Sequence, residues 1–369
     1  MSDLYVEIEA FTWNKVTHDL LDYDCHDLVK SKIISPNSGA IYRTSNNCFY
    51  SAIPQSEDVS MSQNQRLLVL NRRRDHFTIN SELDSANPEL WKVVKYLQDS
   101  NGYELKESDT LKLGRFVLKV KKIFEGSGSD KTPNESLLCE DMSENSPGQA
   151  CRICCCEEGE DDNPLISPCK CIGSMKVIHL LCLKKWLESK VSCRNLGTVS
   201  SYYWNDFICE LCKSHFPGII KHKGREFELV SIKYPKAPYM VLEDEHNEEG
   251  QGQTIHILDI KQGECVRIGR GHNCDIRLTD ISVSRDHAKI SFNKGRFYLQ
   301  DNKSKFGTLL RVKEKIVLQP SQNISLQVNR TMLKISVKVT TDWCCGPCFG
   351  RGTKVRNYAG GDTIPQSPA

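Results

Sequence analysis

The stretch Pro168-Cys169-Lys170-Cys171-Ile172-Gly173-Ser174-Met175-Lys176-Val177-Ile178-His179-Leu180-Leu181-Cys182 decides the fold of the middle of the chain. It holds two close pairs of metal-binding side chains, and a Cys-x2-Cys pair lies on either side of it. The four pairs supply eight candidate ligands: Cys151, Cys154, Cys169, Cys171, His179, Cys182, Cys209 and Cys212. Ligands this close together can point two donors from one tight turn at one ion. The spacing therefore predicts two tetrahedral zinc ions.

Eight protein ligands for two ions leave no coordination position for water, so we expect structural zinc and not a hydrolytic site. Spacing alone does not show which pairs share an ion. Disulfides are disfavoured because the chain has the marks of a reducing compartment. Its start, Met1–Glu7, lacks the basic-then-apolar pattern of a secretion signal, and no apolar run approaches the length of about 18 residues that spans a bilayer. We expect a cytoplasmic or nuclear location and no transmembrane segment.

Composition narrows the class of protein. The 369 residues include 49 Lys and Arg against 47 Asp and Glu, a net charge of +2, so a basic nucleic-acid binder is excluded as the first choice. Hydrophobic residues make up 39%, enough for packed cores, and the length predicts several domains. Alternating apolar residues in many short segments make the chain mainly β.

The ligand order and its surroundings resemble RING-CH (RING-variant) domains, the family of the MARCH ubiquitin ligases. The matching segments are Cys151-Arg152-Ile153-Cys154, Pro168–Leu187 and Cys209-Glu210-Leu211-Cys212, and the gap from Cys182 to Cys209 is at the long end for the family. The resemblance implies a small cross-braced module. In it Cys151, Cys154, His179 and Cys182 hold one zinc, and Cys169, Cys171, Cys209 and Cys212 hold the other.

The resemblance also implies a RING-type ubiquitin-protein transferase. Such a ligase binds a ubiquitin-charged conjugating enzyme and needs neither a catalytic nucleophile nor a covalent intermediate of its own. Ile153 and Trp186 would form the docking patch, with Leu211 at its edge; the alternative is that the three fill a thin core. Lys213 follows the last ligand, where many RING ligases place a basic residue against ubiquitin, although lysine lacks the planar fork of arginine.

Two alternatives concern the same module. A PHD finger, which reads histone tails, uses this ligand order and places an aromatic where Phe207 stands, but the tight Cys169-Lys170-Cys171 pair and Trp186 favour RING-CH. Three cysteines are surplus. Cys155 or Cys156 could replace Cys154 as a ligand, and Cys193 could relay ubiquitin covalently; we interpret all three as spare thiols.

The C-terminal half contains short alternating strands typical of a β-sandwich. Its Ile268-Gly269-Arg270, Ser284-Arg285-Asp286-His287 and Asp301–Thr308 segments resemble the loops of the forkhead-associated (FHA) domain, which binds phosphothreonine peptides. The resemblance implies loop support by His287 and assigns phosphopeptide binding to Arg270, Ser284, Arg285, Asn302 and Lys305. Guanidinium and hydroxyl donors suit phosphate oxygens.

One position departs from the FHA pattern. Many members have Asn before the Gly307-Thr308 pair, and here that place is Phe306. Either Asn302 compensates or the peptide selectivity differs. The alternative is a sandwich that has lost phosphate binding.

The predicted division of the chain follows from these segments. Residues 110–120 resemble late strands of another, degenerate FHA-like sandwich without a Ser-x-x-His loop, and 88–96 is a short helix or strand. The boundaries are 1–125 for an N-terminal globular domain that is mixed or β-rich, 126–150 for a flexible linker, 151–217 for the zinc module, 218–238 for a connector, 239–340 for the FHA sandwich and 341–369 for a disordered tail.

The leading hypothesis is a ligase that selects phosphothreonine-bearing proteins through its FHA domain. The alternatives are a non-catalytic phospho-dependent adaptor and a PHD-like histone reader. Two further hypotheses concern segments outside the domains. Phosphorylated Thr132, followed by Pro133, would occupy the FHA pocket, and the cysteines of Trp343–Phe349 would carry lipid, although free thiols are the preferred interpretation.

Overall fold

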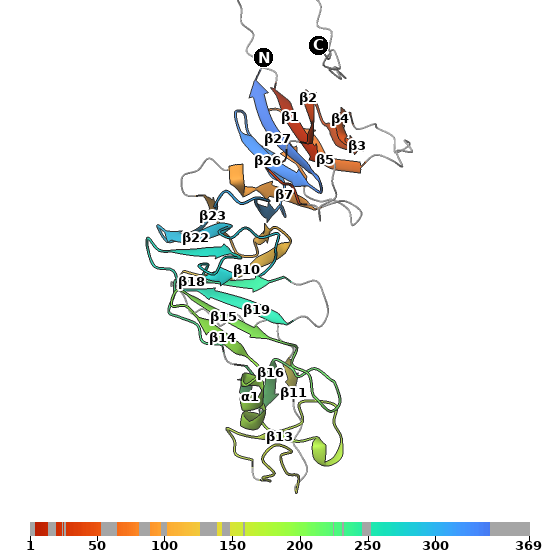
Figure 1. The fold of residues 1–369 in the computed structure, drawn as a ribbon. Coiled ribbons are helices and arrows are strands. Elements are labelled where there is room, and N and C mark those ends of the chain that lie inside the picture. The colour runs from red at the N-terminus through yellow and green to blue at the C-terminus, as the bar shows by residue number, and fades with distance from the viewer. Residues whose placement is uncertain are drawn as a thin grey trace, which may run out of the picture.

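The computed structural model describes residues 4–13, 20–23, 25, 27–52, 65–80, 89–96, 102–125, 139–141, 148–157, 159–223, 225–230, 232–245 and 252–339. Within these ranges the fold is mainly β, with one α-helix, α1 (Leu180–Glu188), and the 3-10 turns η1 (Val94–Tyr96) and η2 (Gly173–Met175). Figure 1 shows three bodies in a row: a first sandwich, a second sandwich and the cysteine-rich module. The predicted multidomain, mainly β fold is confirmed. Among the described residues, no helix has the length and apolar character needed to cross a membrane.

The first sandwich packs two sheets around one apolar core. One sheet has the order β7 (Leu90–Val93), β26 (Asn323–Val328), β27 (Thr331–Val339), β1 (Leu4–Trp13), β2 (Leu28–Ser35). The facing sheet has the order β25 (Ile316–Leu318), β6 (Phe77–Ile79), β5 (Gln65–Arg72), β3 (Gly39–Thr44), β4 (Asn47–Ser51). Alternate residues point inward, as Val6, Ile8 and Ala10 do on β1, because side chains along a strand alternate between its two faces.

The second sandwich follows the same plan. Its first sheet has the order β14 (Ser192–Asn195), β15 (Val199–Trp204), β19 (Gln253–Leu258), β18 (Tyr239–Asp244), β10 (Phe116–Phe124), β9 (Thr110–Leu113), β24 (Thr308–Arg311). The facing sheet has the order β21 (Ile276–Arg277), β20 (Cys265–Gly269), β22 (Ala288–Asn293), β23 (Arg296–Asp301), β8 (Tyr103–Glu104). Because β24 also pairs with β7, one sheet of twelve strands runs through both sandwiches.

The chain visits the two sandwiches in nested order. β27 pairs antiparallel with β1 from Leu4↔Val339 to Thr12↔Thr331, so residues 316–339 complete the first sandwich. Residues 103–124 complete the second, where β10 pairs with β18. The sandwiches therefore do not divide at the predicted limits 1–125 and 239–340. Alternation of apolar residues identifies a strand and its buried face, but it does not say which sheet the strand joins.

The cysteine-rich module is inserted between β10 and β18 of the second sandwich. Its own strands are short: β12 (Leu165–Ile166) pairs with β13 (Ile178–His179), and β16 (Ile219–His222) lies between β11 (Cys139–Asp141) and β17 (Arg225–Glu228). β11 falls in the predicted linker and β16 and β17 in the predicted connector, so both segments contribute strands. Within the segment 88–96, residues 90–96 form β7 and η1, while Thr132 and the tail 341–369 lie outside the described residues.

Candidate functional site

The first of two ligand clusters unites Cys151, Cys154, His179 and Cys182, whose donor atoms all lie within 4.8 Å of one another. Cys151 and Cys154 share a turn, His179 ends β13 and Cys182 lies in the first turn of α1. The Sγ of Cys154 is 3.1 Å from Nδ1 of His179. Three cysteine sulfurs and one imidazole nitrogen that converge in this way suit a tetrahedral zinc ion.

The second cluster unites Cys169, Cys171, Cys209 and Cys212 within the same 4.8 Å limit. The two clusters alternate along the chain, which makes the module cross-braced. Each offers four protein ligands, so a tetrahedral ion would have no open position for water or substrate. The predicted pair of structural zinc sites is confirmed, and their part is to hold a module whose apolar core is largely built around the ligands themselves.

Arg152 lies against the second cluster. Sequence analysis did not predict this contact. Its Nη1 is 3.3 Å from Sγ of Cys171, and its Nη2 is 3.5 Å from Sγ of Cys209. Nη1 also donates to the carbonyl oxygen of Met175 at 2.7 Å. Four thiolates around a divalent ion carry excess negative charge, which a neighbouring guanidinium offsets. Spacing gives no signal for this contact, because Arg152 belongs in sequence to the turn of the other cluster.

The three surplus cysteines belong to neither cluster. Cys155 and Cys156 are exposed on the turn after Cys154, where Cys155 has a left-handed backbone with φ of 61° and the carbonyl oxygen of Cys156 accepts the N–H of Cys151 at 2.9 Å. Cys193 is exposed on β14, at the edge of the twelve-stranded sheet. This placement agrees with Cys154 as the ligand and with spare thiols at the other three positions.

An apolar hollow of about 220 Å³ lies beside the zinc clusters. Ile153, Trp186 and Leu211, which were predicted to form a docking patch, all line it. Ile153 and Leu211 are 47% and 56% exposed, so they do not simply fill a core. The ring of Phe216, which sequence analysis missed, meets Trp186 edge to face at 5.9 Å. Lys213 is exposed on the turn after Cys212 and does not line the hollow.

Two loops of the second sandwich, which carry Arg270 and Ser284, were predicted to bind phosphate. Backbone hydrogen bonds hold these loops together. The N–H of Arg270 donates to the carbonyl oxygen of Ser284 at 3.0 Å, and that of Gly271 donates to Arg285 at 3.0 Å. A Cβ on Gly269 would lie 2.5 Å from the carbonyl oxygen of Arg285, so only glycine permits this close approach. Arg270 and Arg285 are exposed, and neither guanidinium has a partner among the described residues. The backbone of Arg270 thus lies beside the loop that carries Ser284 and Arg285.

His287, which was predicted to support these loops, is fully buried. Its Nδ1 accepts the N–H of Ser284 at 3.0 Å, so the neutral ring carries its proton on Nε2. Nε2 lies 3.2 Å from the carbonyl oxygen of Gly307 and donates to it. Burial lowers the pKa of His287 below its usual 6.5, although the bond to Gly307 and the charge of Asp301 oppose this shift.

Two of the predicted phosphopeptide residues are engaged elsewhere. Asn302 donates through Nδ2 to the carboxylate of Asp286 at 3.0 Å. The Lys305 ammonium lies 3.2 Å from the carboxylate of Asp22, in the connection between β1 and β2 of the first sandwich. The backbone N–H of Lys305 donates to Oγ of Ser284 at 3.0 Å, which ties the two loops together. Phe306 is half-buried, with the Lys305 ammonium 5.5 Å from its ring centre.

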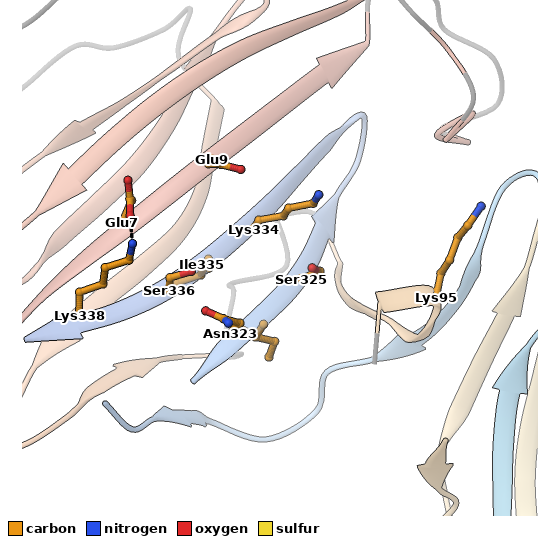
Figure 2. Close-up of a pocket in the computed structure, with 10 residues that line it drawn as sticks. Glu7, Glu9, Lys95, Asn323, Ser325, Lys334, Ile335, Ser336 and Lys338 are labelled. Atoms are coloured by element: carbon orange, nitrogen blue, oxygen red, sulfur yellow. Dashed lines mark ion pairs between the residues drawn. The ribbon is translucent and has the colours of Figure 1, made fainter. Parts of the chain in front are cut away.

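The first sandwich presents a different surface. A hollow of about 510 Å³ lies over β1, β26 and β27. Figure 2 shows the side chains that line it. Glu7 there pairs with Lys32 and, at 2.7 Å, with Lys338, and these two lysines lower the pKa of Glu7. The charges offset one another. Arg43, the second-last residue of β3, is buried, and its guanidinium donates to Oγ1 of Thr331 at 2.8 Å.

Comparison with known families identifies two domains in the chain. The RING-variant domain family matches residues 151–212, and the FHA domain family matches residues 266–327. The chain therefore contains a RING-variant domain and an FHA domain, as both resemblances predicted. This match favours the RING-variant prediction over the PHD alternative.

The chain is similar to several curated ubiquitin ligases over part of its length. It is 34% identical over 209 residues to the probable E3 ubiquitin-protein ligase MARCHF10 of Homo sapiens, which covers 54% of this chain and 23% of that protein. It is 45% identical over 80 residues to E3 ubiquitin-protein ligase MARCHF7 of Rattus norvegicus, covering 21% and 10%. With E3 ubiquitin-protein ligase MARCHF8 of Homo sapiens, identity is 31% over 125 residues, covering 33% and 38%. The chain thus spans well under half the length of these relatives.

A solved FHA domain matches part of the chain. The FHA-1 domain of Mycobacterium tuberculosis Rv1747 is 21% identical and covers 27% of this chain and 95% of that chain, with a TM-score of 0.13. This score is too low to establish a shared fold.

Proposed function

We propose that this chain is a RING-type ubiquitin-protein ligase that takes its targets through phosphothreonine. The observation that carries the proposal is the hollow lined by Ile153, Trp186 and Leu211 in a RING-variant domain. Exposed apolar side chains that gather at one hollow are typical of a protein-binding site. The partner that fits is a ubiquitin-charged conjugating enzyme, since the curated relatives of this domain are ubiquitin ligases.

The reaction needs no nucleophile from this chain. A lysine amine of the target attacks the thioester carbonyl, ubiquitin passes to the amine as an amide, and the thiol of the conjugating enzyme leaves. The RING-variant domain accelerates this step by holding the charged enzyme in a reactive orientation. Zinc, when bound to its eight ligands, keeps the docking hollow in shape and takes no part in bond making.

In this proposal the FHA loops bind the phosphorylated target protein. Arg270 and Arg285 are exposed on two loops whose backbones are hydrogen-bonded to each other, and their guanidiniums and the Ser284 hydroxyl are donors that suit a dianionic phosphate. Phosphorylation of a threonine would thus decide which protein is brought to the charged enzyme. We also propose that the chain works in the cytosol or nucleus, where reduced thiols remain available for zinc.

Ubiquitin discharge from a panel of charged conjugating enzymes tests the ligase directly. We expect the wild type to accelerate discharge with at least one enzyme and the Ile153→Ala, Trp186→Ala double variant to lose this effect at unchanged zinc content. Leu181→Ala is the matched control, because Leu181 is 45% exposed on α1 but does not line the hollow. No discharge from any enzyme, with two zinc ions bound, would instead favour a phospho-dependent adaptor.

A further inference from the structure

The zinc module contributes a hairpin to the neighbouring sandwich. β14 and β15 lie between the ligands Cys182 and Cys209, in the gap that is long for a RING-variant domain. β15 nevertheless pairs antiparallel with β19 of the FHA sandwich through six positions, from Val199↔Leu258 to Trp204↔Gln253. The extra residues of the zinc module are therefore strands of the twelve-stranded sheet, as Figure 1 shows.

A buried polar contact fastens this pairing. Oγ of Ser201 on β15 lies 2.7 Å from Nδ1 of His256 on β19. Nε2 of the same ring lies 3.3 Å from the carboxylate of Asp244 on β18, and the His256 and Asp244 side chains are only 7% and 6% exposed. The hydrogen bond between Ser201 and His256 thus joins β15 to β19, and the same ring lies beside the carboxylate of Asp244 on β18.

Aromatic contacts continue from the hairpin to the docking hollow. Trp204, at the end of β15, packs against the Val241 and Ile255 cluster of the sandwich and stacks on Phe207 at 6.4 Å with a 4° interplanar angle. The carbonyl oxygen of Phe207 accepts the N–H of Phe216 at 2.8 Å, and Phe216 meets Trp186. Rings from both bodies also line one hollow of about 370 Å³ along this seam.

The two chain ends of the insert are held as well. Phe124, where β10 ends, stacks on Tyr239, where β18 begins, at 4.4 Å and 18°. Entry and exit of the zinc module are therefore side by side, and the hairpin adds a third attachment. The six-residue pairing of β15 with β19 therefore restrains the zinc module beyond its two chain connections.

We propose that the β14–β15 hairpin is a positioning element that selects which lysines of a bound target receive ubiquitin. It fixes the conjugating-enzyme hollow at one orientation relative to the FHA loops, so the thioester reaches only a limited region around the phosphothreonine. A module on a flexible tether would instead sweep many positions, because a tether sets an effective concentration and no direction. This inference rests on the proposed function.

A ladder of substrates tests it. Each substrate carries one phosphothreonine and one lysine, separated by a proline-rich spacer of increasing length, and ubiquitin conjugation is timed for each. We expect the wild type to prefer a narrow range of spacings. Two variants test the hairpin: Trp204→Ala, and replacement of residues 192–204 by a Gly-Ser segment of equal length. We expect each to lower the ratio of the fastest to the slowest conjugation rate by roughly tenfold or more, because misplacement by about an ångström costs large factors in rate.

Controls separate this inference from the proposed function. Tyr203→Ala removes an aromatic from the same strand, but Tyr203 is 47% exposed and outside the cluster, so the wild-type spacing profile should remain. Ubiquitin discharge and phosphopeptide affinity are measured for every variant. Equal profiles for the wild type and both hairpin variants, with discharge intact, would overturn the positioning role alone. Absence of discharge in the wild type would overturn the ligase and this inference with it.

Hydrogen exchange on the full wild-type chain gives a measurement that needs no variant. Backbone amides of Val199–Trp204 and Gln253–Leu258 should exchange as slowly as those of β10 and β18, because they belong to one sheet. Fast exchange confined to the hairpin would show a mobile attachment and would contradict the proposal.

Discussion

The carboxylate of Asp22 lies 3.2 Å from the ammonium of Lys305. This ion pair joins the first sandwich to a loop of the second sandwich that was predicted to bind phosphate. The contact is reinforced by the N–H of Tyr23, which donates to the carbonyl oxygen of Lys305 at 3.3 Å, and by Lys95, whose ammonium donates to the carbonyl oxygen of Ser304 at 2.9 Å. A loop that sequence analysis assigned to one FHA domain is therefore supported by residues from the beginning of the chain.

Asp22→Asn should strengthen phosphopeptide binding. The substitution removes a negative charge near the phosphate position and releases Lys305 to face the peptide. Both residues are partly exposed, so we expect a modest gain of about twofold to fivefold, in line with about 0.2–1 kcal/mol for surface ion pairs. Fluorescence anisotropy with a labelled phosphothreonine peptide measures it. Asp27→Asn, on an exposed residue of the same connection, should leave affinity unchanged, and weaker binding by Asp22→Asn would show that the pair orders the loop for the peptide.

Arg270→Ala should weaken phosphopeptide binding by roughly tenfold to a hundredfold. Its free guanidinium is placed to give charge-assisted hydrogen bonds, each worth about 1.5–3 kcal/mol. Isothermal titration with phosphorylated and unphosphorylated peptides measures the loss, which should fall on the phosphorylated form only. Arg277→Ala, on an exposed residue of β21 in the same sandwich, is the matched control. Binding that survives Arg270→Ala would place the phosphate elsewhere.

Arg152→Ala should loosen the second zinc without unfolding the first site. The guanidinium contacts three of the four cysteines of that cluster, and loss of such outer contacts typically lowers metal affinity about tenfold to a hundredfold. Competition with a colorimetric zinc chelator should release one of the two ions early. Lys170→Ala keeps the same change of charge at an exposed position between Cys169 and Cys171 and should behave as the wild type. Simultaneous release of both ions by Arg152→Ala would mean that the clusters act as one unit.

The ligand clusters could be predicted from sequence because their information is local. Cys151 and Cys154, or Cys209 and Cys212, face one ion through the geometry of a single turn, and the pairing of turns followed from resemblance. Arg152 could not be predicted, since it reaches across space to the cluster formed by the other two pairs.

The nested sandwiches could not be predicted for a different reason. Residues 110–120 were identified as late strands of an FHA-like fold, but their apolar alternation is the same in either sandwich. The choice depends on contacts distant in sequence, such as Arg115, whose N–H donates to Oγ of Ser282 at 2.9 Å and whose guanidinium lies 3.1 Å from the carboxylate of Asp280. Long-range pairing of this kind leaves no local pattern.

Acidification should destabilise the FHA loops through His287. Burial lowers its pKa in the folded chain, whereas the unfolded chain titrates near 6.5, so the unfolded state binds more protons between these two values. Stability must therefore fall as the pH drops through that window, by about 1.4 kcal/mol for each unit of pKa depression. A proton on Nδ1 would also face the N–H of Ser284, which that nitrogen accepts at 3.0 Å, so the loop should open and release the phosphopeptide.

Thermal unfolding and peptide affinity between pH 7.5 and about pH 5 check this prediction. His287→Asn removes the titrating ring and keeps an acceptor near the Nδ1 position, so it should be less stable at neutral pH but should show a shallower decline below pH 6.5. The two proteins differ at this residue alone, so the difference between the two slopes isolates His287. Parallel slopes would mean that His287 is protonated in the folded chain without cost. In that case Nδ1 would have to give up the hydrogen bond from the N–H of Ser284 and donate its own proton to another acceptor.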